Sequence, residues 1–456
     1  MKLLFVTGRL AEPALRAVLD DLARRHGFEP VVTVLPISVA ALMTPAWVAR
    51  HLQIPEGVER VILPGHCRGD LSALEGKAGV PVELGPEDLR DLPRHLAGEE
   101  PSRPGYGAHD IEIIAEINHA PRLSLNEILA IAQRYREEGA DVIDVGCDPG
   151  DRWSGAGPTV AALKKRGFRV SIDSFHPDEV ADAVAAGAEL VLSVNAANRA
   201  QAAHWDVEVV AIPDEPHSLV GLRETSRFLT SRGVAHRLDP VLDPIGFGFA
   251  ASLGRYLEVR ALLPERPLMM GVGNLTELTD VDSAGVNTLL VGFCQETGVR
   301  SVLTTEVINW ARSSVREIDL ARRLMHYAVT HRLPPKRLDA RLIMLRDPRL
   351  RRFGRDTLEE LAARIKDPNW RLFAEDGYLY ALNNRGLVVD EDPFRLFDRL
   401  GIDDPSHAFY LGYELAKATT ALTLGKDYRQ DQALDWGHLT VPEVSHRDRK
   451  QRGETP

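Results

Sequence analysis

Asparagine, aspartate and glutamate side chains recur where short apolar runs end in the middle of the chain. The runs include IEIIAEI, FRVSID and PLMMGVGN. The polar residues at or just past the ends of eight such runs are Asn118, Asp148, Asp173, Asn195, Asp214, Asp243, Asn274 and Glu306. Carboxylates and amides offer many hydrogen-bond acceptors, and neither lysine nor histidine dominates the set. These residue types favour a neutral, donor-rich heterocycle as the ligand over a polyanion.

Each apolar run is followed by a helical pattern, and this pair repeats between about residues 109 and 335. Eight strand–helix units predict a (β/α)8 TIM barrel, whose functional site lies at the C-terminal ends of its strands. One of the helices begins with Ser124 and Glu127 at the spacing of a capping box. The barrel would bring the polar residues together at one rim.

Residues 1–100 show a different alternation, in which the strand KLLFVT precedes the amphipathic helix AEPALRAVLDDLARR. This order predicts a small, Rossmann-like, doubly wound α/β domain. The segment 98–107 is rich in proline, glycine and charge, which is typical of a linker.

A third pattern begins after the barrel. Residues 345–440 combine helical runs with two alternating strands around Asp376-Gly377, a strong hairpin signal. They predict a C-terminal α+β domain. The charged residues 441–456 predict a disordered tail.

Composition excludes several classes of partner. The 456 residues carry a formal net charge of −11, which argues against nucleic acid because phosphate binding needs a basic face. Cys67, Cys147 and Cys294 are odd in number and widely spaced, which indicates neither a disulfide framework nor a zinc cluster. The apolar start is broken at Gly8, and no apolar run approaches the length of a membrane span. We therefore expect a reduced, cytoplasmic protein with no membrane partner.

Three stretches with ordered glycines and acids lie within the predicted barrel. They are EEGADVIDVGCDPG at 137–150, VSIDSFHPDEVADAVAAGAELVLSVN at 170–195 and VLDPIGFGF at 241–249. Together they resemble the pterin-binding barrels, namely the dihydropteroate synthases and the methyltetrahydrofolate-dependent methyltransferases. With its flanking domains, the chain resembles the dihydropteroate synthase-related proteins that are linked to tetrahydromethanopterin biosynthesis.

The resemblance implies a pterin site at the strand ends. It gives Asp173 and Asp243 the catalytic positions on either side of the ring, where a carboxylate can accept from the pterin 2-amino group and N3–H together. The full set of implied pterin contacts is Asp173, Asn195, Asp243, Gly248, Gly271 and Asn274. The alternative role for each aspartate is a helix N-cap in a strand–helix loop.

The resemblance also implies that Asn118 binds Mg²⁺ and the diphosphate of the substrate. The candidate anion contacts are Asn118, Arg122, Arg152 and Arg312. The chain departs from the synthases where Gly273-Asn274-Leu275 replaces their Ser-Arg-Lys and Leu303-Thr304-Thr305 replaces their Arg-Val-His. We expect either Arg312 and Arg316 or groups from another domain to compensate for the missing cations.

The implied activity is that of a dihydropteroate synthase-like transferase. Such an enzyme joins 6-hydroxymethyl-dihydropterin diphosphate to an arylamine, either p-aminobenzoate or a ribofuranosyl-aminobenzene phosphate, in folate or tetrahydromethanopterin biosynthesis. One alternative is a methyl-tetrahydropterin-binding protein that acts with a corrinoid partner, which Asn274 and the missing cations favour. Another is a pterin-binding scaffold subunit without catalysis. The resemblance further implies a homodimer.

Overall fold

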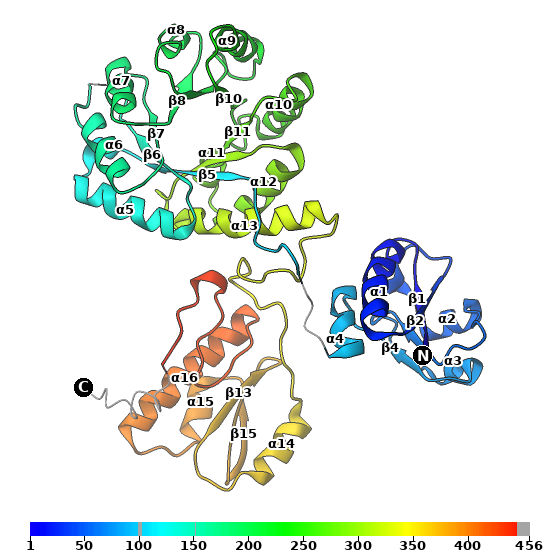
Figure 1. Cartoon of the computed structure of the whole chain (residues 1–456). Coiled ribbons are helices and arrows are strands. Elements are labelled where there is room, and N and C mark those ends of the chain that lie inside the picture. The colour runs from blue at the N-terminus through cyan, green and yellow to red at the C-terminus, as the bar shows by residue number, and fades with distance from the viewer. Residues whose placement is uncertain (99–102, 151, 445–456) are drawn as a thin grey trace. The chain divides into compact units, whose positions relative to one another are not determined.

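The computed structural model describes residues 1–98, 103–150 and 152–444 (Figure 1). The chain divides into two compact units, Met1–Gly105 and Tyr106–Pro456. Part of the predicted linker and residues 445–456 of the predicted tail lie outside the described residues. Within the described ranges, no helix is both long and apolar enough to cross a lipid bilayer.

The first unit is a parallel sheet with helices on both faces. Its strands are β1 (Lys2–Thr7), β2 (Glu29–Val34), β3 (Arg60–Leu63) and β4 (Val82–Leu84), in the order β2-β1-β3-β4. Its helices are α1 (Glu12–His26), η1 (Ala40–Leu42), α2 (Pro45–His51), α3 (Ser72–Ala78), η2 (Leu89–Asp91) and α4 (Leu92–Ala97). Leu15, Leu19 and Leu22 of α1 repeat at helical spacing and pack on one face of β1, whereas Val48 of α2 packs on the other. The predicted doubly wound domain is confirmed.

The second unit begins with eight parallel strands that form a barrel. They are β5 (Glu112–Ile117), β6 (Val142–Gly146), β7 (Val170–Asp173), β8 (Leu190–Val194), β9 (Glu208–Ala211), β10 (His236–Leu238), β11 (Met269–Gly271) and β12 (Ser301–Thr304). The strands are hydrogen-bonded in the order β10-β9-β8-β7-β6-β5-β12-β11. Leu238 bridges to Leu268, and its N–H donates to the Pro267 carbonyl at 2.9 Å, which joins the two edges of the sheet. The predicted TIM barrel is confirmed.

Helices surround the barrel strands (Figure 1). They are η3 (Ala120–Arg122), α5 (Leu125–Glu138), α6 (Ala156–Lys165), α7 (Pro177–Ala185), α8 (Arg199–Ala202), α9 (Val220–Ser231), α10 (Phe249–Leu262), α11 (Gly273–Thr276), α12 (Ser283–Thr297), η4 (Asn309–Ala311) and α13 (Ser314–Thr330). Ser124 and Glu127 form the predicted capping box at the start of α5.

Side chains alternate between the two faces of each barrel strand. In β5, Ile113, Ala115 and Ile117 belong to the large core between the strands and the helices, whereas Ile114 packs inside the barrel with residues of β6, β8, β9 and β11. Because the side-chain period of a strand is two, Glu116 shares the inner face with Ile114. This alternation decides which polar side chains reach the interior of the barrel.

The C-terminal part of the second unit is a three-stranded antiparallel sheet with helices. Its elements are α14 (Arg355–Arg364), β13 (Arg371–Glu375), β14 (Tyr378–Asn383), β15 (Gly386–Asp390), α15 (Pro393–Asp398), α16 (Pro405–Leu424) and η5 (Gly437–Leu439). Asp376 and Gly377 form the predicted turn between β13 and β14, both with positive φ. Glu443, at the start of the predicted tail, accepts hydrogen bonds from Tyr413 and Lys417 of α16.

Candidate functional site

Three acidic side chains from adjacent strands meet inside the C-terminal end of the barrel. Glu116 of β5, Asp144 of β6 and Asp173 of β7 each place a carboxylate oxygen within 4.8 Å of the other two. Strand pairing explains this proximity, because Glu116 is level with Asp144 and Gly146 is level with Asp173. A side chain at Gly146 would meet the Glu116 carboxylate. A glycine there leaves room for the acid.

These three carboxylates share few hydrogen bonds. Asp144 is fully buried, and its Oδ1 accepts a 2.6 Å hydrogen bond from the Ser171 hydroxyl, while its Oδ2 has no protein partner. Burial, reinforced by Asp173 and Glu277, raises the pKa of Glu116 to about 8. Burial likewise raises the pKa of Asp173 to about 6 and that of Asp144 well above its usual range. The group therefore holds protons or a cation at neutral pH.

Asn118 lies beside this group at the exit of β5. Its Oδ1 accepts a hydrogen bond from the hydroxyl of Thr305, which follows β12. The same hydroxyl also interacts with Glu277, whose Oε1 is buried and has no hydrogen-bond partner in the structure. The predicted metal ligand Asn118 is thus part of a polar chain that leads to the acidic group.

Asp243 follows β10, three strands around the barrel from Asp173. Its Oδ2 receives a 2.8 Å hydrogen bond from Arg255 of α10 and lies 3.2 Å from Nδ1 of His217. Within the described part of the chain, no protein group contacts Oδ1 as a hydrogen-bond donor. Gly248 has φ +124° and places its backbone so that an added Cβ would lie 3.2 Å from the Asp243 carboxylate. Asp243 therefore keeps one acceptor oxygen available, next to the backbone of Gly248, which has no side chain.

A buried network fixes the segment that carries Asp243. Asp239 is buried and accepts from the N–H of Val241 at 2.8 Å and from the Tyr256 hydroxyl at 2.6 Å. It also accepts from the Gly271 N–H, and burial raises the pKa of Asp239 to about 6. Val241 has φ +64°, which a β-branched residue rarely adopts. These contacts hold the backbone at Val241, two residues before Asp243, in a strained conformation.

The two predicted asparagine contacts have structural partners as well. Asn274 lies in α11, and its Nδ2 donates to the Leu242 carbonyl at 3.0 Å, next to Asp243. Asn195 follows β8, and its Oδ1 accepts from the N–H of Ala197 at 3.0 Å in a local turn. Asn274 is thereby tied to the Asp243 segment, whereas the side chain of Asn195 shapes its own loop.

The predicted cations are all paired with neighbouring groups. Arg122 donates to both carboxylate oxygens of Asp148, at 2.8 and 3.1 Å, and His119 also contacts Asp148. Arg152 pairs with Asp182 and Asp178 of α7. Arg312 is exposed and donates to Asn309, and Arg316 pairs with Asp319 in its own helix. The structure does not bring Arg122, Arg152, Arg312 and Arg316 together into one anion site.

Glu306 also differs from its expected place on the rim. Its side chain is only 1% exposed, pairs with Arg134 of α5 and accepts from the N–H of Val315 in α13. Burial raises the pKa of Glu306 to about 7. The residue therefore stabilises the packing of two helices and does not face a ligand at the rim.

Five residues of this site are not among the contacts predicted from the sequence: Glu116, Asp144, His217, Arg255 and Glu277. In IEIIAEI, strand alternation places Glu116 on the same face as Ile114, and in DVIDVG it places Asp144 on the same face as Val142. Alternation along the strand could therefore have predicted that both acids point into the barrel. Arg255 lies in the middle of a helix, where no local pattern distinguishes it from a solvent-exposed arginine.

Two segments of the chain match known families. Residues 117–213 match a family described as "Pterin binding enzyme", and residues 1–87 match a "Family of unknown function (DUF6513)". The uncharacterized protein MJ0107 of Methanocaldococcus jannaschii is 25% identical over 94% of this chain and 98% of its own length. The pterin-binding match begins at Ile117 and includes Asn118, Asp144, Asp173 and Asn195.

Solved structures of dihydropteroate synthases are similar to the barrel. The enzyme of Thermus thermophilus in complex with 6HMPPP is 23% identical, with a TM-score of 0.39, over 49% of this chain and 94% of that one. Yersinia pestis DHPS with a pterine-sulfa conjugate is 20% identical, with a TM-score of 0.38 and the same coverage of both chains. The family match shows that residues 117–213 are similar to the pterin-binding enzymes.

Proposed function

We propose that the barrel binds a pterin at the ends of its strands and transfers the pterin to an arylamine, as a dihydropteroate synthase-type enzyme does. The observation that supports this most is the state of Asp243. Arg255 holds one carboxylate oxygen at 2.8 Å, and the other has no protein donor among the described residues. A carboxylate oriented in this way is a suitable acceptor for the amino and N–H donors of a pterin.

Asp173 supplies the second acceptor in this proposal. Its carboxylate has no hydrogen-bond donor within the described ranges, and its pKa of about 6 leaves it mostly ionised at neutral pH. Loss of diphosphate would leave positive charge on the pterin, and the carboxylates of Asp173 and Asp243 would stabilise that charge. The carbon–oxygen bond to diphosphate breaks, a carbon–nitrogen bond to the amine forms, and the amine nitrogen releases a proton.

The acidic group fits a divalent cation. The three carboxylates, which include the unpartnered Oδ2 of Asp144, form an all-oxygen donor set, which is what Mg²⁺ prefers. Glu116, Asp144 and Asp173 would hold it, in place of Asn118 alone, whose Oδ1 accepts from Thr305. When bound, Mg²⁺ supplies positive charge for the leaving diphosphate. This would offset the cations that the chain lacks at this rim.

One observation favours methyl transfer as a second candidate. Glu116, Asp144, Asp173 and Glu277 line the interior with carboxyl groups, which offer a diphosphate no positive charge unless a cation intervenes. A methyl-tetrahydropterin has no diphosphate and does not need that charge. Its methyl group would pass to a corrinoid on a partner protein.

Diphosphate release distinguishes the candidates. Purified full-length protein is mixed with 6-hydroxymethyl-dihydropterin diphosphate and Mg²⁺, with p-aminobenzoate, its ribofuranosyl phosphate derivative or no amine. Release that depends on the amine supports the transferase, and the preferred amine identifies the pathway. Pterin binding without release rejects the transferase and leaves the methyltransferase and scaffold alternatives.

A further inference from the structure

The N-terminal unit contains a pocket of about 340 Å³ that the barrel chemistry does not involve. It lies where β1, β3 and β4 end, and Thr7, Leu63 and Gly85 are among its lining residues. In the order β2-β1-β3-β4, the chain reverses its direction of winding between β1 and β3. Open α/β sheets bind their ligands in the crevice at this switch point. Position and size therefore both indicate a small-molecule site.

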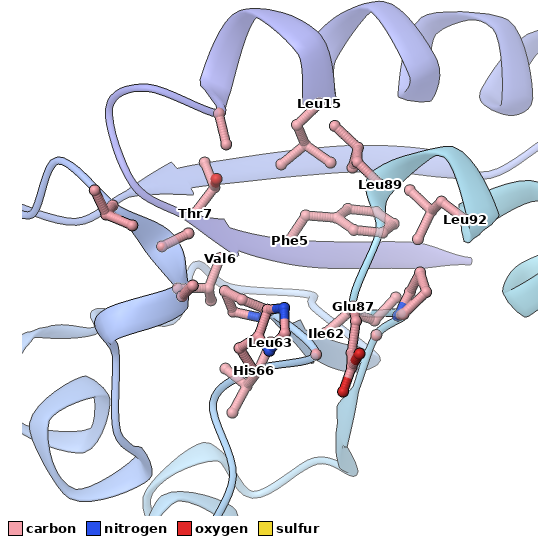
Figure 2. Close-up of a pocket in the computed structure, with 18 of the residues that line it drawn as sticks. Phe5, Val6, Thr7, Leu15, Ile62, Leu63, His66, Glu87, Leu89 and Leu92 are labelled. Carbon is pink, nitrogen blue, oxygen red and sulfur yellow. The ribbon is translucent and has the colours of Figure 1, made fainter. Parts of the chain in front are cut away.

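The wall of the pocket is mostly apolar. Figure 2 shows Leu15, Leu89 and Leu92 gathered on one side of Phe5, with His66 and Glu87 on the other side. The loops after β3 and β4 are already packed together, because a Cβ on Gly65 would lie 2.5 Å from backbone atoms of the loop after β4. This wall is preformed, and apolar and aromatic side chains such as Phe5 are typical of pockets that bind ring systems.

The first loop is not built to bind phosphate. The N–H groups of Arg9 and Leu10 donate to the carbonyls of Ile37 and Ser38, at 2.9 and 3.1 Å, so they are not free to bind an anion. The helix that follows begins with Glu12 and Pro13, which add a negative charge and remove an N–H donor. Phosphate-binding loops of α/β domains show the opposite features.

Several polar groups around the pocket can accept hydrogen bonds, although the Pro64 carbonyl already accepts from Cys67 and the side chains of Ser38 and His66 can also donate. Pro64 and Pro86 lie in the loops that follow β3 and β4 and have no N–H to donate. Glu87 contributes a carboxylate, which Arg68 holds from outside the lining, and Thr7 contributes a hydroxyl. A ligand that offers exocyclic amino and ring N–H donors would match these acceptors.

We propose that the N-terminal unit binds a flat, amino-substituted fused heterocycle without phosphate, in the pocket at the exit of β1 and β3. Guanine nucleosides and pterins share this chemistry, so either could be the source of the ligand. The proposal does not depend on the function of the barrel.

The test is equilibrium binding of guanosine, GMP and 6-hydroxymethylpterin to the full-length protein, with hydrogen–deuterium exchange to locate each ligand. We expect guanosine or the pterin to bind below about 1 mM and to protect residues 5–11, 62–66 and 85–89, which line or adjoin the pocket. Protection by guanosine alone assigns the site to a nucleoside, and protection by the pterin assigns it to a pterin. A barrel-bound pterin would instead protect the strand ends of the second unit.

Two variants give the binding test a structural control. Ala11→Phe fills the pocket and should weaken binding at least about tenfold, whereas Ala46→Phe, on an exposed position of α2 outside the lining, should leave it unchanged. Glu87→Gln should weaken binding by a smaller factor, because it removes the charge of the acceptor. No protection of the pocket by either heterocycle, equal binding by both phenylalanine variants, or GMP binding about tenfold tighter than guanosine would overturn the proposal.

Discussion

Arg255 and Asp243 form a buried ion pair with an N–O distance of 2.8 Å, in which the side chains are 8% and 15% exposed. The same guanidinium donates to the carbonyls of Pro240 and Val241, at 3.2 and 2.7 Å. One helix side chain therefore fixes both the carboxylate and the backbone that leads to it. The orientation of Asp243 depends on this arginine.

Replacing Arg255 should accordingly impair pterin binding and stability together. Arg255→Ala leaves a largely buried carboxylate whose remaining ion-pair partner among the described residues is His217, and breaking a buried pair typically costs about 3–5 kcal/mol. We expect the affinity for 6-hydroxymethyl-dihydropterin to fall at least about tenfold, which is about 1.4 kcal/mol. Arg255→Lys should retain part of the pterin affinity and part of the stability. Arg227→Ala, on an exposed position of α9, is the control, and an affinity within about twofold of wild type for Arg255→Ala would contradict this role.

Stability should depend on pH through the acidic group. The pKa values of Glu116 and Asp173 rise on folding from 4.5 and 3.8 to about 8 and about 6. A carboxyl whose pKa is raised on folding contributes its full stability below the unfolded pKa and loses it as the pH rises through the folded pKa. We expect the free energy of unfolding to fall between about pH 4.5 and pH 8 in the absence of metal, because the folded state holds these protons more tightly than the unfolded chain does.

Glu116→Gln should flatten this dependence, because glutamine carries no titrating proton. The control is Glu137→Gln, which changes an exposed glutamate of α5. Denaturant unfolding at a series of pH values measures both variants. A Glu116→Gln curve that keeps the wild-type slope would show that the acidic group does not govern the pH response.

Divalent cation binding should require Asp144. Asp144→Asn removes the fully buried carboxylate whose Oδ2 lacks a protein partner, so we expect the affinity for Mg²⁺ to fall at least about tenfold. Titration calorimetry with MgCl₂ measures this directly. Asp148→Asn is the matched control, since Asp148 lies just beyond the same strand but pairs with Arg122. Equal Mg²⁺ affinity in the two variants would place the cation elsewhere.

The strained backbone at Val241 leads to a prediction about stability alone. Asparagine tolerates a φ of +64° better than a β-branched residue does. Val241→Asn should therefore raise the free energy of unfolding by about 1 kcal/mol. Pterin affinity should stay unchanged, because Asp239 still accepts from the backbone N–H of residue 241. Thermal unfolding measures the gain, and a destabilised variant would mean that packing of the valine matters more than strain.

The sequence predicted the barrel well, because the periodicity of strands and helices repeats along the chain. It also placed Asp173 and Asp243 at or just past strand ends, as the structure has them, whereas their role as pterin contacts stays a prediction. It did not reveal that Arg122 pairs with Asp148, or that Glu306 turns toward Arg134. Those outcomes depend on side-chain partners that are distant in sequence, and local patterns do not encode them. Glu116 was accessible by strand parity, whereas Arg255 required the folded structure.

The most direct test of the central claim is equilibrium binding of 6-hydroxymethyl-dihydropterin to wild type, Asp243→Asn and Asp206→Asn. Asp206 precedes β9 at the opposite end of the strands, is exposed and has φ +55°, which asparagine accepts. We predict that Asp243→Asn loses at least about tenfold in affinity, while Asp206→Asn binds as wild type does. Wild-type affinity in Asp243→Asn, or no pterin binding by the wild-type protein, would contradict a pterin site at the strand ends.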